Sequence, residues 1–146
     1  MDRVEELTPN ECIELLGRRT VGRVAFTERA LPAIRPVNYA LVGHQIVLQT
    51  DPHGLGQRLD GQVVAFEVDE IDPESETGWS VVVTGTARLL RSPSDLIRQA
   101  RVPLVTLAGA GHDARVCIVP GEITGRRIRP AIDAARGLNR GAAPAS

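Results

Sequence analysis

Residues 63–90 read VVAFEVDEIDPESETGWSVVVTGTARLL, and this stretch decides the fold. In its first nine residues a period of two places Val64, Phe66 and Val68 on one face. Its last twelve residues alternate again and begin with Trp79, the only tryptophan. Such alternation, with many β-branched residues, predicts two strands that each have one apolar face. The acidic DPESETG segment between them predicts a solvated connection, so the two strands form an antiparallel pair at the centre of an all-β core.

Five further segments have the composition and spacing of strands. The second of them contains Pro36, and because proline cannot donate to a strand ladder, this point is predicted to be a sheet edge or a bulge. The last two are separated by Pro120 and Gly121, which predict a turn between them. The five segments are residues 20–27, 33–42, 45–50, 114–119 and 122–129.

Helices are expected only at the periphery. Thr8 and Glu11 have the spacing of a capping box, and Pro9 suits the first helical position. This helix is predicted to run to Leu16 and to end at Gly17. The other expected helices are residues 55–60 and 92–101.

The resulting fold class is all-β, a small antiparallel barrel or sandwich of six to seven strands with peripheral helices. A chain of 146 residues has the size of one domain, which we place at residues 1–130. Residues 131–146 are rich in alanine, arginine and glycine, have little to bury, and are expected to form a flexible tail.

Composition narrows the range of partners. The net charge of −1 offers no electrostatic reason to expect a nucleic acid or an anionic membrane. No stretch approaches the roughly 18–20 apolar residues of a membrane span. With an acidic, polar N-terminal segment, a cytoplasmic location is expected. All 17 basic residues are arginine, so no lysine is available to form a Schiff base or to anchor a phosphate.

The usual catalytic constellations are missing from the sequence. The histidines His44, His53 and His112 fall in glycine-rich turns without metal-ligand spacing, so no metal site is expected. Cys12 and Cys117 lie among apolar residues and are read as small buried hydrophobes. The sequence contains no GxSxG nucleophile motif. If the protein performs chemistry, a bound cofactor is expected to supply the reactive group.

The segment DPHGLGQRLDG, residues 51–61, directly follows a predicted strand. A glycine-bearing turn that leads into a helix offers backbone N–H groups to an anion, and Arg58 adds a charge-assisted contact. The same residues are also typical of a surface loop whose glycines serve only turn geometry. The spacing alone leaves both interpretations open, because no nucleotide-binding fingerprint is present.

Several segments stand in an order that resembles the pyridoxamine 5'-phosphate oxidase-like flavin-binding split-barrel family. They are most similar to the branch that includes nitroimidazole-reductase-type proteins. The resemblance covers about residues 5–130, and PVNY, AFEVD and GWSV are specific as a set. The segments are TPNECIELL, VGRVAF, PAIRPVNYAL, QTDPHG, VVAFEVDEID, TGWSVVVTGTARLL and EITGRRI.

The resemblance implies a six-stranded split barrel that forms a homodimer and holds FMN at the subunit interface. It implies that RPVNY contacts the flavin ring, that the threonine ending the next strand and the following loop receive the phosphate, and that GWS flanks the cofactor. An arginine of the EITGRRI segment is expected either at a solvated edge or at a partner subunit's phosphate. The implied cofactor-binding residues are Arg35, Pro36, Val37, Asn38, Tyr39, Thr50, His53, Gly54, Arg58, Trp79, Ser80 and Arg126.

The residue chemistry agrees with a flavin in part. Asn38 offers both a donor and an acceptor, and a cation such as Arg35 favours a reduced, anionic ring. Taken alone, Trp79 suits a core position as well as a cofactor contact. Relatives commonly carry a lysine in the phosphate loop, whereas this chain has none and Arg58 is the candidate replacement.

The expected function is that of an FMN-dependent oxidoreductase which reduces a small organic acceptor. One alternative keeps the fold but uses a deazaflavin coenzyme. Another is a sensor or storage protein that binds flavin or haem without turnover.

Overall fold

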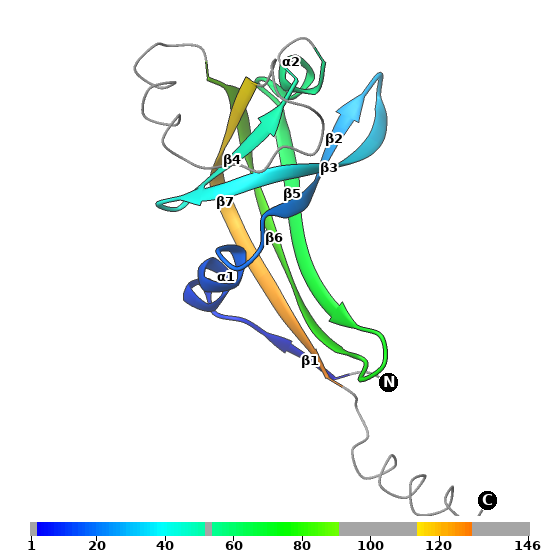
Figure 1. Cartoon of the computed structure of the whole chain (residues 1–146). Helices are drawn as coiled ribbons and strands as arrows, with labels where there is room; N and C mark the ends of the chain where they lie inside the picture. The colour runs from blue at the N-terminus through cyan, green and yellow to red at the C-terminus, as the bar shows by residue number, and fades with distance from the viewer. Residues whose placement is uncertain (1–2, 52–53, 91–113, 130–146) are drawn as a thin grey trace, which may run out of the picture.

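The computed structural model describes residues 3–51, 54–90 and 114–129, which form seven strands and two helices (Figure 1). The predicted helix at residues 92–101, the expected tail at residues 131–146, and His53 and His112 lie outside the described residues. The elements are β1 (Arg3–Glu6), α1 (Pro9–Leu16), β2 (Val21–Glu28), β3 (Leu31–Val42), β4 (Gln45–Thr50), α2 (Leu55–Leu59), β5 (Val63–Asp72), β6 (Thr77–Leu89) and β7 (Ala114–Arg129).

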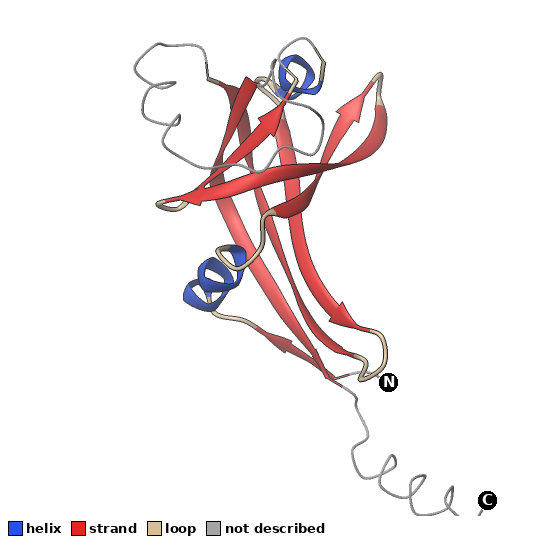
Figure 2. Cartoon of the chain, in the orientation of Figure 1, coloured by secondary structure: helices blue, strands red, loops and turns tan. Residues whose placement is uncertain are grey.

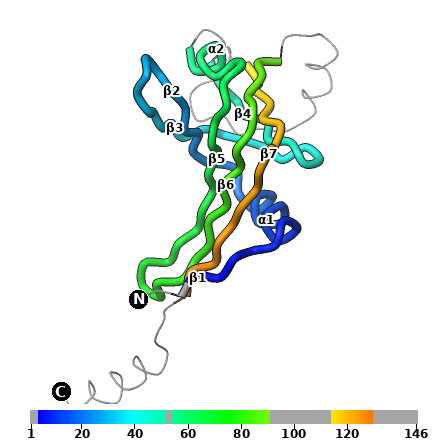
Figure 3. The backbone as a smooth tube through the Cα atoms, turned by 180° about the vertical axis from the view of Figure 1, so that it is seen from behind, coloured from blue at the N-terminus to red at the C-terminus, as the bar shows by residue number. Residues whose placement is uncertain are grey.

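All strand pairs are antiparallel, and the sheet closes on itself. The strand order is β1-β7-β4-β3-β2-β5-β6, and β6 also pairs with β7. Figure 2 shows that the helices lie at the periphery of this mainly β structure. From behind, β5, β6 and β7 run side by side for most of the length of the molecule, and β1 lies against the lower end of β7 (Figure 3). The predicted fold class, an antiparallel barrel with peripheral helices, is confirmed.

The alternating stretch at residues 63–90 forms the β5–β6 hairpin. The two strands pair from Val63 opposite Thr86 to Asp72 opposite Thr77. Every second residue is buried over residues 64–68 of β5 and 79–87 of β6, as the alternation predicts. The buried members are Val64, Phe66, Val68, Trp79, Val81, Val83, Gly85 and Ala87.

The capping box at the start of α1 is also confirmed. The main-chain N–H of Thr8 donates to Glu11 Oε1 at 2.9 Å, and the N–H of Glu11 donates to Thr8 Oγ1 at 3.2 Å. Gly17 ends the helix with a right-handed φ of −72°. The buried face of α1 carries Cys12, Leu15 and Leu16, so the interpretation of Cys12 as a buried hydrophobe is correct.

The prediction of two strands separated by a turn at Pro120 and Gly121 is wrong. Residues 114–129 form one strand, β7, which pairs with β6 from Val116 to Ile128. The register shifts at this point, since Thr84 pairs with Glu122 while Gly85 pairs with Pro120. The proline and glycine therefore form a β-bulge, where one extra residue is accommodated without reversing the chain. A local turn signal could not reveal this, because the long partner strand keeps the chain extended.

The edge strand β1 was not predicted. Its sequence, RVEE, is short and mostly charged and has no apolar face. It forms because the far end of β7 offers a partner, with Arg3 opposite Arg129 and Glu6 opposite Arg126. The predicted number of about seven strands agrees with the structure for a compensating reason. The unpredicted β1 adds one strand, and the joining of the last two predicted strands into β7 removes one.

The expectation for Pro36 is confirmed as a sheet edge. β3 pairs with β2 over residues 31–38 and with β4 over residues 38–42. Pro36 therefore lies where β3 has a strand on one side only, and its missing N–H does not interrupt a central ladder. No helix among the described residues has the length and hydropathy needed to cross a membrane.

Candidate functional site

Asn38 occupies the point where β3 changes its pairing partner. It lies opposite Val21 of β2 and opposite Gln49 of β4, so it belongs to both ladders. The residue is only 4% exposed, and its Oδ1 has no hydrogen-bond partner among the described residues. A buried amide oxygen without a partner carries a desolvation cost of about 1–3 kcal/mol. At this fork of β3, where the strand leaves β2 and begins to pair with β4, a buried amide oxygen is therefore left without a donor among the described residues.

The residues just before Asn38 pass from solvent into the core. Arg35 and Pro36 are exposed, whereas Val37 is 4% exposed. Val37 lies opposite Gly22, where an added Cβ would collide with the Phe66 ring. The Phe66 ring of β5 therefore packs closely on β2 at the residue opposite Val37.

Tyr39 is a core residue. Its ring packs edge-to-face on Phe66 at a centroid distance of 4.8 Å, and its hydroxyl donates to the carbonyl oxygen of Leu16. Burial raises the pKa of its phenol to about 12. Its side chain is thus fully engaged within the protein, unlike that of Asn38.

The end of β4 and the start of α2 lie together at the upper end of the barrel (Figure 1). Thr50 is 7% exposed, and its Oγ1 donates to the carbonyl oxygen of Ala114 at 3.3 Å. The N–H groups of Gly54 and Gly56 both donate to the carbonyl oxygen of Asp51, at 3.3 and 3.0 Å. The expectation of free backbone donors in this loop does not hold for these two groups.

Arg58 of α2 is paired with a carboxylate. Its Nη1 lies 2.7 Å from Glu28 Oε1, and its side chain is 48% exposed. The Gln62 side chain joins the same two regions, since Nε2 donates to the carbonyl oxygens of Thr27 and Arg58 at 3.0 and 2.7 Å. The end of β2 and the α2 helix are therefore held against each other.

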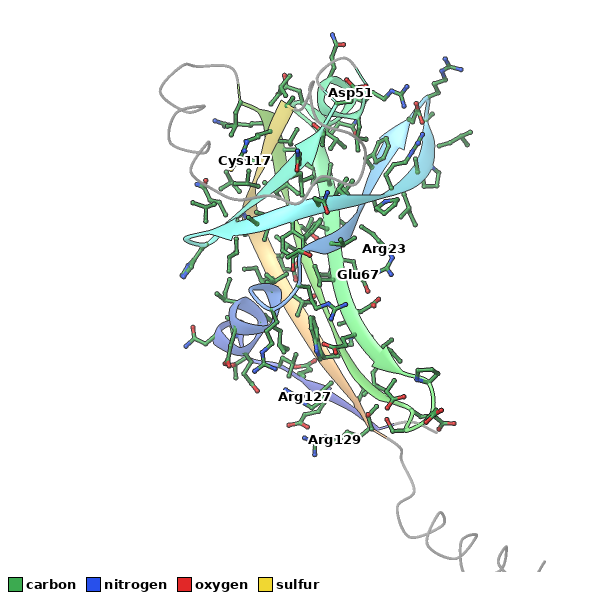
Figure 4. All side chains as sticks on the ribbon, viewed as in Figure 1. Arg23, Asp51, Glu67, Cys117, Arg127 and Arg129 are labelled. Carbon is green, nitrogen blue, oxygen red and sulfur yellow. The ribbon has the colours of Figure 1, made fainter. Side chains whose placement is uncertain are left out.

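The other expected cofactor residues lie at the opposite end of the barrel. Trp79 pairs with Arg127 and is 6% exposed, which makes it a core residue of the chain. Ser80 pairs with Arg126, which is exposed. Figure 4 shows Arg127 near β1, whereas Asp51 lies at the α2 end. Within the chain the predicted residues therefore fall into separate groups, because Trp79, Ser80 and Arg126 lie at the end of the barrel away from Thr50, Gly54 and Arg58.

Sequence reasoning missed a charged cluster on the outer face of β2 and β5. Arg23 Nη1 contacts Glu67 Oε1 at 3.0 Å and Asp69 Oδ2 at 3.4 Å (Figure 4). Desolvation, reinforced by the hydrogen bond and charge of Asp69, raises the pKa of Glu67 to about 7. The only sequence signal was the alternation of acids along β5, which does not show that an arginine of another strand faces them.

A cavity of about 750 Å³ opens beside the β6–β7 bulge. Its volume is typical of a small-molecule pocket, although it includes none of the predicted cofactor residues. Among the described residues, no group of three His, Cys, Asp or Glu could hold a metal ion. The cavity is lined by Val63, Thr84, Gly85, Thr86, Arg88, Val119, Pro120, Gly121 and Glu122.

Comparison with known proteins defines the class to which this barrel belongs. The family model described as pyridoxamine 5'-phosphate oxidase matches residues 8–127. The chain belongs to this family of split-barrel proteins, as its motifs indicate. An uncharacterized protein of Mycobacterium tuberculosis is 41% identical over 133 residues, covering 86% of each chain.

Solved structures support the same assignment. An FAD binding protein from Mycobacterium smegmatis is 32% identical, covers 86% of this chain and 98% of its own, and superposes with a TM-score of 0.76. An FAD-binding protein from Mesorhizobium loti is 22% identical, covers 85% of this chain and 97% of its own, and has a TM-score of 0.69. The second likeness shows the fold alone.

Proposed function

We propose that this protein binds a flavin at the fork of β3 and acts as an oxidoreductase toward a small organic acceptor. The observation that carries the proposal is the buried Oδ1 of Asn38, which has no partner among the described residues. A flavin ring carries an N–H donor as well as acceptors, so the Asn38 amide suits it. The family relationship and the relative described as an FAD binding protein support a flavin over other ring systems.

The flavin is proposed to be FMN, as the resemblance implies. FAD is the second candidate, because the 32% identical relative is described as an FAD binding protein. A bound flavin supplies the two-electron redox chemistry that no side-chain constellation of this chain offers. The protein contributes the donor and acceptor of Asn38, the cation of Arg35 beside the ring, and a pocket that fixes orientation.

A homodimer with the flavin at its interface completes the proposal. β3 exposes Leu31 at 68% and Ile34 at 65%, while Val37 and Tyr39 of the same strand are buried. Its exposed apolar side chains are available to a second copy. In a dimer, Trp79, Ser80 and Arg126 of one subunit would approach the fork of the other, which accounts for their separation within a single chain.

Titration with a panel of ligands tests this function. We expect FMN or FAD to bind with a Kd below about 100 μM, roughly −5.5 kcal/mol, and to shift the visible spectrum of the flavin. Reduction followed by transfer to a quinone or nitro compound should then be observable. A matching titration with the deazaflavin coenzyme and with haem identifies the alternatives, and binding of none of these ligands would refute the proposal. Flavin binding without turnover would assign the protein to the sensor or storage class.

A further inference from the structure

We propose that Glu28 is the internal counter-ion of Arg58 and that it limits the affinity of this site for a ligand phosphate. This inference rests on the proposed flavin function, and in particular on Arg58 as the cation that faces the phosphate. It makes Glu28 a residue that determines how strongly the protein distinguishes a phosphorylated ligand from one without phosphate.

The Arg58–Glu28 contact is a short ion pair. Its atoms are 2.7 Å apart, whereas the pair between Arg18 and Glu14 measures 3.2 Å. Both side chains of the first pair are partly withdrawn from solvent, with exposures of 48% and 32%, compared with 60% and 69% for the second. Partial burial reduces screening by water, so the carboxylate offsets much of the arginine charge.

A third side chain, that of Gln62, also holds the Arg58–Glu28 pair in place. Gln62 accepts from the N–H of Thr27 at 3.1 Å and donates to the carbonyl oxygen of the same residue at 3.0 Å. The same amide donates to the carbonyl oxygen of Arg58 at 2.7 Å. Because Thr27 directly precedes Glu28, one side chain positions both members of the pair, and little ordering entropy is needed to keep them together.

The backbone donors near the start of α2 are already engaged within the protein. The N–H groups of Gly54 and Gly56 are already bonded to Asp51. A phosphate approaching Arg58 must therefore compete directly with the Glu28 carboxylate for the guanidinium donors.

The test compares FMN with riboflavin, which has the same ring without the phosphate. Glu28→Gln keeps the shape of the side chain and removes its charge. We expect FMN affinity to rise about 2- to 5-fold, the upper part of the range for a partly exposed ion pair, while riboflavin affinity changes by less than about 2-fold. Arg58→Ala should weaken FMN binding more in the Glu28→Gln background than in the wild type, because the full arginine charge is available there.

Glu14→Gln is the matched control, since it removes a carboxylate from another arginine pair on α1 and should alter neither affinity. Thermal melting of each variant verifies that it is folded. If riboflavin binds and FMN affinity is the same in wild type and Glu28→Gln, the counter-ion role is wrong while the flavin function stands. Equal changes for both ligands would also overturn it, since the pair would then act on the ring or the fold. Failure of the wild type to bind either ligand would remove both proposals.

Discussion

The hydroxyl of Tyr39 donates a hydrogen bond to the carbonyl oxygen of Leu16, which lies in the last turn of α1. The last carbonyl groups of a helix have no partner within the helix, so a buried side chain that reaches one of them stabilises the helix end. This contact joins β3 to α1 across the core. Tyr39 therefore has a structural role, whereas its neighbour Asn38 is proposed to face the ligand.

Replacing Tyr39 by phenylalanine should destabilise the protein without greatly affecting ligand binding. The change leaves the Leu16 carbonyl oxygen without this donor but keeps the packing on Phe66. We expect a loss of about 1–2 kcal/mol in the free energy of unfolding, measured by urea denaturation. Flavin affinity should change by less than about 2-fold. A large affinity loss at unchanged stability would instead place Tyr39 at the cofactor.

Replacing Asn38 by leucine should have the opposite effect, weakening ligand binding without destabilising the protein. The substitution removes a buried acceptor that has no partner among the described residues, at similar side-chain volume. We expect the ligand-free protein to be unchanged or more stable by up to about 1 kcal/mol. Riboflavin and FMN should both bind about 10-fold more weakly, because each loses the same contact to the ring. Undiminished riboflavin binding would show that the ring lies elsewhere.

The raised pKa of Glu67 predicts a specific pH dependence. Its value of about 7 lies above the usual 4.5, because burial and the nearby Asp69 disfavour the charged form. The folded state therefore binds this proton more tightly than the unfolded state, and the stability contributed by Glu67 is lost as pH rises from about 4.5 to 7. Glu67→Gln should remove this dependence.

The measurement is the free energy of unfolding of wild type and Glu67→Gln across this range. The advantage of the variant should grow between pH 5 and 7 and remain constant above pH 7, as the same linkage requires. Arg23 faces both carboxylates and moderates the effect. A parallel pH profile for wild type and Glu67→Gln would contradict the assignment.

Gly22 is required by close packing at the start of the fork. An added Cβ would collide with the Phe66 ring and lie 2.9 Å from the carbonyl oxygen of Glu67. We expect Gly22→Ala to cost about 1–3 kcal/mol through overpacking, measured by chemical denaturation. Gly17→Ala is the matched control, because its nearest contact is 3.5 Å and its φ of −72° suits alanine. Equal stability of the two variants would argue against the packing of β2 on β5 described above.

The proposed dimer can be checked by light scattering. Twice the chain mass of 15.7 kDa is about 31 kDa, which we expect at micromolar protein concentration. Ile34→Asp places a charge on the exposed apolar part of β3, so it should shift the mass toward the monomer. A mass near 15.7 kDa for the wild type would refute the dimer.

Local patterns determined much of this fold. The period-two alternation of residues 63–90 identified both strands of the β5–β6 hairpin and the faces that they bury. The capping box at Thr8 and Glu11 identified the start of α1, because both of its hydrogen bonds join residues three apart in the sequence. The segments PVNY, AFEVD and GWSV, taken as a set, were sufficient to indicate the family, which the comparisons show.

Only the tertiary structure decided which strands close the barrel. β7 is continuous because β6 lies beside it, and β1 exists because β7 offers it an edge. The pairing of Arg58 with Glu28 and of Arg23 with Glu67 joins residues that are 30 and 44 positions apart. Alternation along one strand identifies a buried face, but it contains no information about which side chain a neighbouring strand places opposite. That information arises from strand order and register, which depend on the packing of the whole chain.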